Sequence, residues 1–119
     1  MPTTYKVLGQ SNPSATTLTT LYTVPSATNA VISSITVANL AATSATFRIA
    51  VRVAGSSISN EEYIAYDITL GASDTTVLTM GVTMSATDVL SVYASSATVA
   101  FQAFGSCLLY TSDAADDLT

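Results

Sequence analysis

The sequence predicts an all-β protein that forms a single antiparallel β-sandwich of about eight strands, jelly-roll-like or immunoglobulin-like. Two observations lead to this prediction. Short segments repeatedly alternate β-branched or aromatic residues with small polar ones, which is the period-2 pattern of half-buried strands. No segment keeps helical spacing of apolar residues over several turns, and the abundant Ser and Thr are poor residues for helix interiors. The 119 residues allow one such domain.

The individual strands are delimited by clusters of Gly, Pro, Asn and Ser. We expect strands over residues 5–8, 18–24, 30–39, 45–53, 62–70, 75–80, 89–94 and 98–104. The turns between them are expected at residues 11–14, 25–29, 54–57, 71–74 and 95–97. The order of the strands in the sheets does not follow from the sequence.

The alternation also assigns side chains to the core, because every second residue of a strand lies on the same face. The predicted apolar rows are Phe47, Ile49, Val51 and Val53; Ile64, Tyr66, Ile68 and Leu70; Leu90, Val92 and Ala94; and Val99, Phe101 and Ala103. A core of this size is marginal for about 100 residues, so association with other copies would add stability.

The polar sides of two successive segments predict a cross-strand pairing. If segments 45–53 and 62–70 form a hairpin, one register places Arg48 opposite Asp67 and Arg52 opposite Tyr63. Such pairs contribute roughly 0.2–1 kcal/mol each, and an Arg–Tyr pair adds cation–π attraction. One interpretation is an exposed pairing that only fixes the register. The other is that both arginines anchor a contact between subunits.

Outward-facing tyrosines are the second candidate feature. Tyr63 and Tyr93 are predicted to face solvent, where they suit the rim of a protein contact or, as an alternative, stacking on a sugar. The candidate interface residues are therefore Arg48, Arg52, Tyr63, Asp67 and Tyr93.

Residues that could perform chemistry are few. The chain has no His, one Cys, 3 Lys and Arg, and 8 Asp and Glu, for a formal net charge of −5. Without His there is no Ser-His or Cys-His nucleophile pair, and a lone Cys forms no internal disulfide. Asp74 and Asp88 precede strands and are expected to accept hydrogen bonds from turn N–H groups. We expect no enzymatic activity, no cofactor and no metal site.

The same composition argues against two classes of partner. Three cations make no basic patch for nucleic acid. No run approaches the length of about 18 apolar residues that a membrane span needs. We therefore expect neither a nucleic acid nor a membrane as a partner.

The end of the chain differs in composition from the rest. The stretch of residues 107–117, which holds the single Cys, resembles the translation of a transposon-end adaptor used to build sequencing libraries. The resemblance implies that residues 1–106 form the β-sandwich domain and that residues 107–119 are a non-native or disordered tail. The alternative is a natural acidic C-terminus that frays.

Several segments together resemble a known family. They are residues 5–10, 21–25, 30–39, 45–52, 87–94 and 103–105, with Leu-Tyr-Thr-Val-Pro at 21–25 and Thr-Asp-Val-Leu-Ser-Val-Tyr-Ala at 87–94. These segments are similar to those of small tailed-phage virion proteins from environmental phage genomes. The resemblance implies a non-enzymatic structural role in the virion, most concretely as a capsid decoration or cement subunit, otherwise in the neck, tail or fibre. It supplies no catalytic residues.

The implied partners are further copies of this chain and other virion proteins such as the major capsid protein. The protein would be made in the host cytoplasm and located in the virion. An edge strand, or the N-terminal segment of residues 2–14, is then expected to be covered by a neighbouring copy.

Two alternatives stay open at this point. The chain is a self-assembling subunit of an extracellular filament, although its start shows no basic and apolar export signal. Otherwise it is a carbohydrate-binding module that uses Tyr63, Tyr66 or Tyr93.

Overall fold

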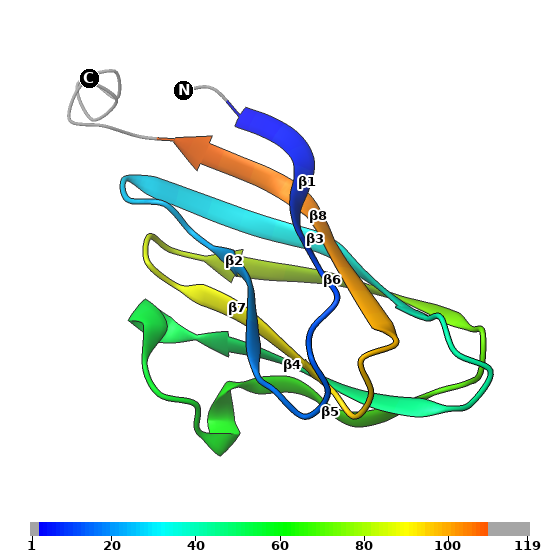
Figure 1. Cartoon of the computed structure of the whole chain (residues 1–119). Helices are drawn as coiled ribbons and strands as arrows, with labels where there is room; N and C mark the ends of the chain where they lie inside the picture. The colour runs from blue at the N-terminus through cyan, green and yellow to red at the C-terminus, as the bar shows by residue number, and fades with distance from the viewer. Residues whose placement is uncertain (1–2, 110–119) are drawn as a thin grey trace, which may run out of the picture.

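The computed structural model describes residues 3–109, which form an all-β chain (Figure 1). Its strands are β1 (Thr3–Ser11), β2 (Thr19–Thr23), β3 (Thr28–Asn39), β4 (Ala45–Arg52), β5 (Tyr63–Leu70), β6 (Thr75–Met84), β7 (Val89–Ala94) and β8 (Val99–Leu109). Two short 3-10 turns, η1 (Val53–Gly55) and η2 (Asn60–Glu62), lie in the loop between β4 and β5. The predicted all-β class and the positions of the eight strands are confirmed.

The strands form two four-stranded antiparallel sheets with the orders β1-β8-β3-β6 and β2-β7-β4-β5. Within them β1 pairs with β8, β2 with β7, β3 with β6 and β4 with β5. This is the pairing that results when one long hairpin is rolled onto itself, so the sandwich is a jelly roll rather than an immunoglobulin fold.

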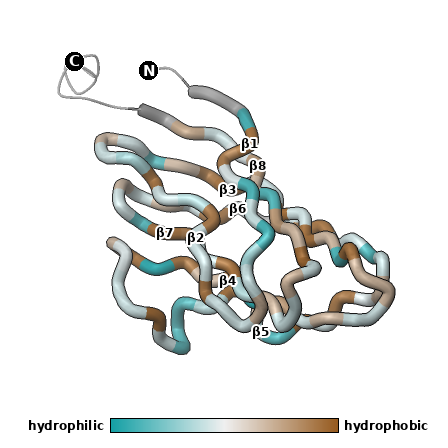
Figure 2. Tube along the Cα trace, in the orientation of Figure 1, coloured by the Kyte–Doolittle hydropathy of each residue, from teal (hydrophilic) through white to brown (hydrophobic). Residues whose placement is uncertain are grey.

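Side chains from the facing sides of both sheets make the core. Phe47 of β4 and Phe101 of β8 meet edge to face, with ring centroids 6.1 Å apart. Ile32 and Ile35 of β3 and Leu90 of β7 are fully buried around them. Figure 2 shows the apolar residues recurring along the strands of both layers, as the alternation predicts.

The two sides of the sandwich, where the edge strands of one sheet face those of the other, differ in how closely the strands approach. On one side β1 and β2 come into contact, and Gly9 makes this possible because a Cβ there would collide with the backbone carbonyl of Leu21. On the other side contacts between β5 and β6 are sparse. The sandwich is therefore closed along β1 and β2 and open along β5 and β6.

Buried and turn polar groups are satisfied locally. The buried Asn39 donates to the carbonyls of Thr43 and Gly71 and accepts from the Ala41 N–H and the Thr98 hydroxyl. It thereby ties together the loops at one end of the sandwich.

The predicted turn roles of Asp74 and Asp88 are confirmed. Asp74 accepts a hydrogen bond from the N–H of Thr75, and Asp88 accepts one from the N–H of Ser85. The second oxygen of Asp88 also accepts from the N–H of Ala54 in η1, which fastens the β4–β5 loop to the turn before β7.

The predicted β4–β5 register is right at one end and wrong at the other. Phe47 lies opposite Ile68, as predicted, but the register then shifts at two β-bulges in β5. Tyr63 consequently pairs with Ala50, so the predicted Arg52–Tyr63 pairing is wrong.

The same bulges overturn part of the predicted core. Leu70 is buried, but Ile64, Tyr66 and Ile68 are exposed because β5 is an edge strand and its alternation is interrupted. Val53 lies beyond the end of β4, in η1, and is also exposed.

The last strand passes the domain boundary expected at Ser106. β8 continues to Leu109, and Cys107 pairs with Ala30 of β3 and Thr4 of β1. The described sandwich thus includes residues 107–109, whereas the rest of the expected tail, residues 110–119, lies outside the described residues. The N-terminal segment pairs within its own chain as β1, from Thr3 onward.

Candidate functional site

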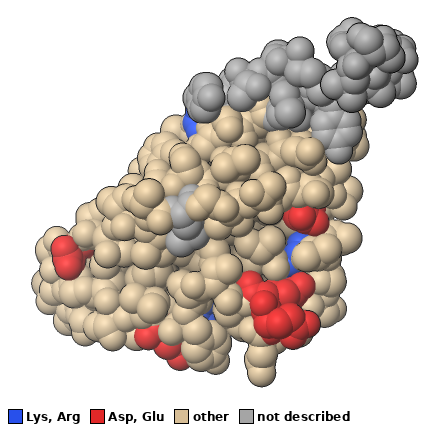
Figure 3. Space-filling model, turned by 180° about the vertical axis from the view of Figure 1, so that it is seen from behind, with Lys and Arg blue, Asp and Glu red and all other residues tan. Residues whose placement is uncertain are grey.

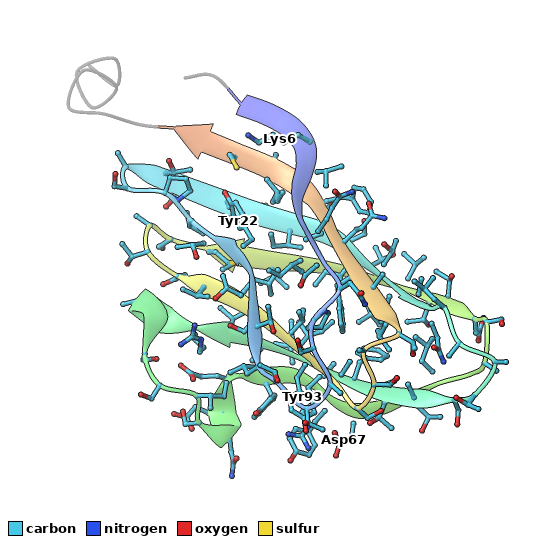
Figure 4. The ribbon with its side chains drawn as sticks, in the orientation of Figure 1. Lys6, Tyr22, Asp67 and Tyr93 are labelled. Atoms are coloured by element: carbon cyan, nitrogen blue, oxygen red, sulfur yellow. The ribbon has the colours of Figure 1, made fainter. Side chains whose placement is uncertain are left out.

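The outer face of the β2-β7-β4-β5 sheet carries a group of charged and aromatic side chains that contact one another. Arg48 lies at its centre, on the face of β4 that points away from the core, because its neighbours Phe47 and Ile49 are buried. On one side Arg48 is in register with Tyr93 of β7. Asp67 and Tyr93 project from their strands in the same region of the molecule (Figure 4).

A β-bulge brings two successive residues of β5 to Arg48. Phe47 pairs with Ile68 and Ile49 pairs with Ala65, so both Tyr66 and Asp67 lie opposite Arg48. Asp67 has a φ of 49°, in the left-handed region that Asp tolerates better than most residues. In a regular strand these two side chains would point to opposite faces. The bulge lets both reach the guanidinium.

The guanidinium of Arg48 is held from three directions. Its Nε and Nη2 donate to the two carboxylate oxygens of Asp67, at 2.6 and 3.3 Å. Its Cζ lies 4.2 Å from the ring centroid of Tyr66 and 4.3 Å from that of Tyr93. Tyr63 extends the group, since its ring meets Tyr66 edge to face at a centroid distance of 4.9 Å. The planar, forked donor of Arg suits this arrangement, which Lys could not reproduce.

This ion pair shifts both ionisation equilibria. The hydrogen bond from Arg48 lowers the pKa of Asp67, and the same bond raises the pKa of Arg48. The side chains of the pair are 22% and 44% exposed. Solvent therefore screens their attraction, and the pair orients the tyrosine rings more than it stabilises the fold.

Arg52 has a separate position and a separate task. Its Nε donates to the hydroxyl of Ser91, and its Nη1 donates to the carbonyls of Gly55 and Ser56. It thus holds the β4–β5 loop over the outer face of the sheet. The structure brings Arg48, Asp67, Tyr63 and Tyr93 together and leaves Arg52 out of the group.

The loop is fixed at its other end by Glu62. The Glu62 carboxylate accepts from the hydroxyl of Ser56 at 2.8 Å and from the N–H of Ser59 at 3.1 Å. These hydrogen bonds lower the pKa of Glu62, and the bond from Ser56 has the larger effect. The loop therefore presents Asn60, at the start of η2, in a defined position beside β5.

A hollow open to solvent lies at the edge of this group. Asn60, Tyr63 and Tyr66 line it, and its volume is about 440 Å³. We name it the tyrosine hollow. The sequence predicted Tyr63 to be outward, but it placed Tyr66 in the core and did not single out Asn60. The bulges that turn Tyr66 outward have no signature in the local residues.

The edge of the sheet beside this hollow is apolar. Ile64, Tyr66 and Ile68 are 43%, 54% and 44% exposed. We call these three residues the β5 edge. An exposed apolar edge strand presents unpaired backbone groups and apolar surface together, which is a typical feature of association sites.

The described residues show no arrangement for metal binding or membrane crossing. Residues 3–109 contain no group of three or more His, Cys, Asp or Glu side chains that could hold a metal ion. In the same range no helix has the length and apolar character of a bilayer span.

Comparison with known proteins adds no assignment. No protein-family model matches the chain, and no curated protein shows significant similarity to it.

Proposed function

We propose that this chain is a non-enzymatic structural subunit of a virion, most concretely a capsid decoration subunit that associates with its own copies and with the capsid shell. The observation that carries this proposal is the β5 edge, where three large apolar side chains of one strand, Ile64, Tyr66 and Ile68, stay exposed. Covering such an edge with a neighbouring subunit removes apolar surface from water, which favours association.

The surface outside the β5 edge also suits close packing between subunits. Its side chains are mostly small and uncharged, and only 9% of all residues are charged. Figure 3 shows wide uncharged areas on one face of the molecule, with the largest group of acidic atoms at the lower right and smaller ones at the left end and the lower edge. Small side chains lose little rotamer entropy on association, and low charge limits repulsion between copies.

The fold agrees with this role by analogy. Jelly rolls occur in capsid proteins and also in lectins, so the fold alone does not decide the function. The similarity of segments such as residues 87–94 to tailed-phage virion proteins favours the virion.

The test is the oligomeric state of the purified chain and of one edge variant. Ile68→Asp places a carboxylate on the β5 edge, whereas Val31→Asp makes the same change at a 40%-exposed position on the other sheet. We expect native mass spectrometry to show oligomers for the wild-type chain and for Val31→Asp, and monomers for Ile68→Asp. A wild-type chain that is monomeric at high concentration would overturn the proposal.

Imaging separates the virion from the filament. Negative-stain micrographs of the assembled chain would show closed oligomers for a decoration subunit and open helical fibres for a filament subunit. Co-sedimentation of the chain with assembled capsid shells would directly support a role in the virion. Fibres that do not bind such shells would favour a filament subunit.

A further inference from the structure

We propose that the tyrosine hollow binds a neutral hexopyranose unit of a glycan. This inference goes beyond the structural role proposed above and is argued from different contacts; Tyr66 belongs to both surfaces, so a copy seated on the β5 edge would compete with the sugar for it. The volume of about 440 Å³ lies in the range of small-molecule sites, roughly 300–1,000 Å³, and accommodates one or two sugar rings.

The aromatic rings of the hollow already pack against other side chains before any ligand binds. The guanidinium of Arg48 packs on Tyr66, and Tyr63 meets Tyr66 with an interplanar angle of 82°. Two nearly perpendicular rings that line one hollow can contact a sugar from two directions. The C–H groups of a pyranose are weakly positive and pack well against the negative face of an aromatic ring. Since the rings are already ordered, little conformational entropy is lost on binding.

The polar groups of the hollow are available to form hydrogen bonds with the hydroxyl groups of a sugar. Within the described part of the chain, the Asn60 amide and the hydroxyls of Tyr63 and Tyr66 form no hydrogen bond with another residue. An amide offers both donors and an acceptor, and a phenol offers one of each. Vicinal hydroxyls of a sugar, which also donate and accept, match this set.

The charges around the hollow favour a neutral sugar over an acidic one. Asn60 is followed by Glu61 and Glu62. Arg48, which packs on Tyr66, is already paired with Asp67, and Arg52 already donates to Ser91 and to the carbonyls of Gly55 and Ser56. A carboxylate on the ligand would meet repulsion without a free cation to offset it. Uronic and sialic acids should therefore bind more weakly than neutral hexoses.

The test is a titration of the isotopically labelled chain followed by amide NMR. The probes are the methyl glycosides of glucose, galactose, mannose and N-acetylglucosamine, short linear oligomers of each, and glucuronic and sialic acid. We expect saturable shifts at Asn60, Tyr63 and Tyr66 for at least one neutral sugar, with a Kd of about 1–10 mM, because few ligand atoms make contact. Tighter binding of an oligomer than of its methyl glycoside would identify a glycan chain as the natural form of the ligand.

Substitutions assign the binding to the hollow. Tyr63→Ala removes a ring and should weaken binding at least about tenfold, while Tyr63→Phe should keep most of it. Asn60→Ala, in the exposed loop where folding is not at risk, should weaken binding about threefold or more. Ser57→Ala is the matched control, since Ser57 is exposed in the same loop and does not line the hollow.

The outcomes are distinct from those of the assembly test. The monomeric Ile68→Asp chain should bind the sugar at least as tightly as the wild-type chain, because no neighbouring copy then covers Tyr66, which belongs to both the β5 edge and the hollow. Asn60→Ala should leave the oligomeric state unchanged. The proposal is overturned if no neutral sugar binds at tens of millimolar, if Asn60→Ala and Tyr63→Ala bind as well as the wild type, or if the shifts map to another surface. A preference for acidic sugars would contradict the charge argument and with it the proposed ligand class.

Discussion

Arg48 links its own strand, β4, to side chains of both neighbouring strands on the outer face. It reaches Asp67 through two hydrogen bonds and contacts the rings of Tyr66 and Tyr93. Because these side chains are exposed, the contacts add little to stability, and they place the rings of Tyr66 and Tyr93 against the guanidinium. Rings ordered in this way suit recognition of a partner or a ligand.

The Arg48–Asp67 pair makes a prediction about acid stability. The pKa of Asp67 is lowered in the folded chain, so the pair stabilises the fold above the ordinary Asp pKa of 3.8 and this contribution is lost as the pH falls through the lower folded value. When the pH is lowered from about 6 to about 2.5, we expect the unfolding free energy of Asp67→Asn to fall by less than that of the wild type. Urea midpoints at the two pH values measure this fall in stability. An equal fall in both chains would show that the Arg48–Asp67 pair does not contribute to it.

The environment of Tyr22 predicts a loss of stability at alkaline rather than acidic pH. Its burial, together with the hydrogen bond between its hydroxyl and the Cys107 thiol at 3.1 Å, raises the pKa of Tyr22 above the ordinary value of 10.0. The neutral phenol is favoured in the folded chain, so its contribution to stability is present below pH 10.0 and declines as the pH rises above it. In a spectrophotometric titration of the tyrosines, Tyr22→Phe should remove a phenol that ionises above the ordinary value of 10.0. If the variant instead loses a transition at or below that value, the pKa of Tyr22 is not raised.

At the scale of the strands, two glycines distinguish tight backbone contact from open space. A Cβ on Gly105 of β8 would collide with the backbone carbonyl of Val31 in β3, whereas a Cβ on Gly81 of β6 would meet nothing within 4 Å. We expect Gly105→Ala to cost about 1–3 kcal/mol of unfolding free energy and Gly81→Ala to change it by less than about 0.5 kcal/mol. Urea denaturation of both variants tests this, and equal midpoints would contradict the strand packing.

The strands themselves could be predicted from the sequence, because period-2 alternation directly reflects one buried and one exposed face. The order within the sheets could not, since pairs such as β1 with β8 depend on contacts between the two ends of the chain. For the candidate site, Arg48 and Asp67 could be predicted as a pair because the β4–β5 register is regular up to Phe47, directly before Arg48. Tyr93 could be predicted as outward because the alternation places Leu90, Val92 and Ala94 on the opposite face. The exposure of Tyr66 was missed because each bulge in β5 depends on pairing with β4 and leaves no residue signal.

On the scale of the whole molecule, the sandwich is asymmetric. It is closed where β1 and β2 meet and open where β5 and β6 make few contacts, and the β5 edge lies on the open side. A neighbouring subunit placed there would complete the burial of apolar surface that a single chain of this size leaves unfinished. The proposed assembly follows from this asymmetry and not from any reactive group.

Hydrogen–deuterium exchange at two protein concentrations tests this central claim most directly. If a neighbouring copy covers the β5 edge, the amides of residues 63–70 exchange more slowly in the concentrated sample, while those of β1 exchange equally fast in both. Exchange in β5 that is independent of concentration, over a range in which oligomers form, would show that the chain associates through another surface and would contradict the account.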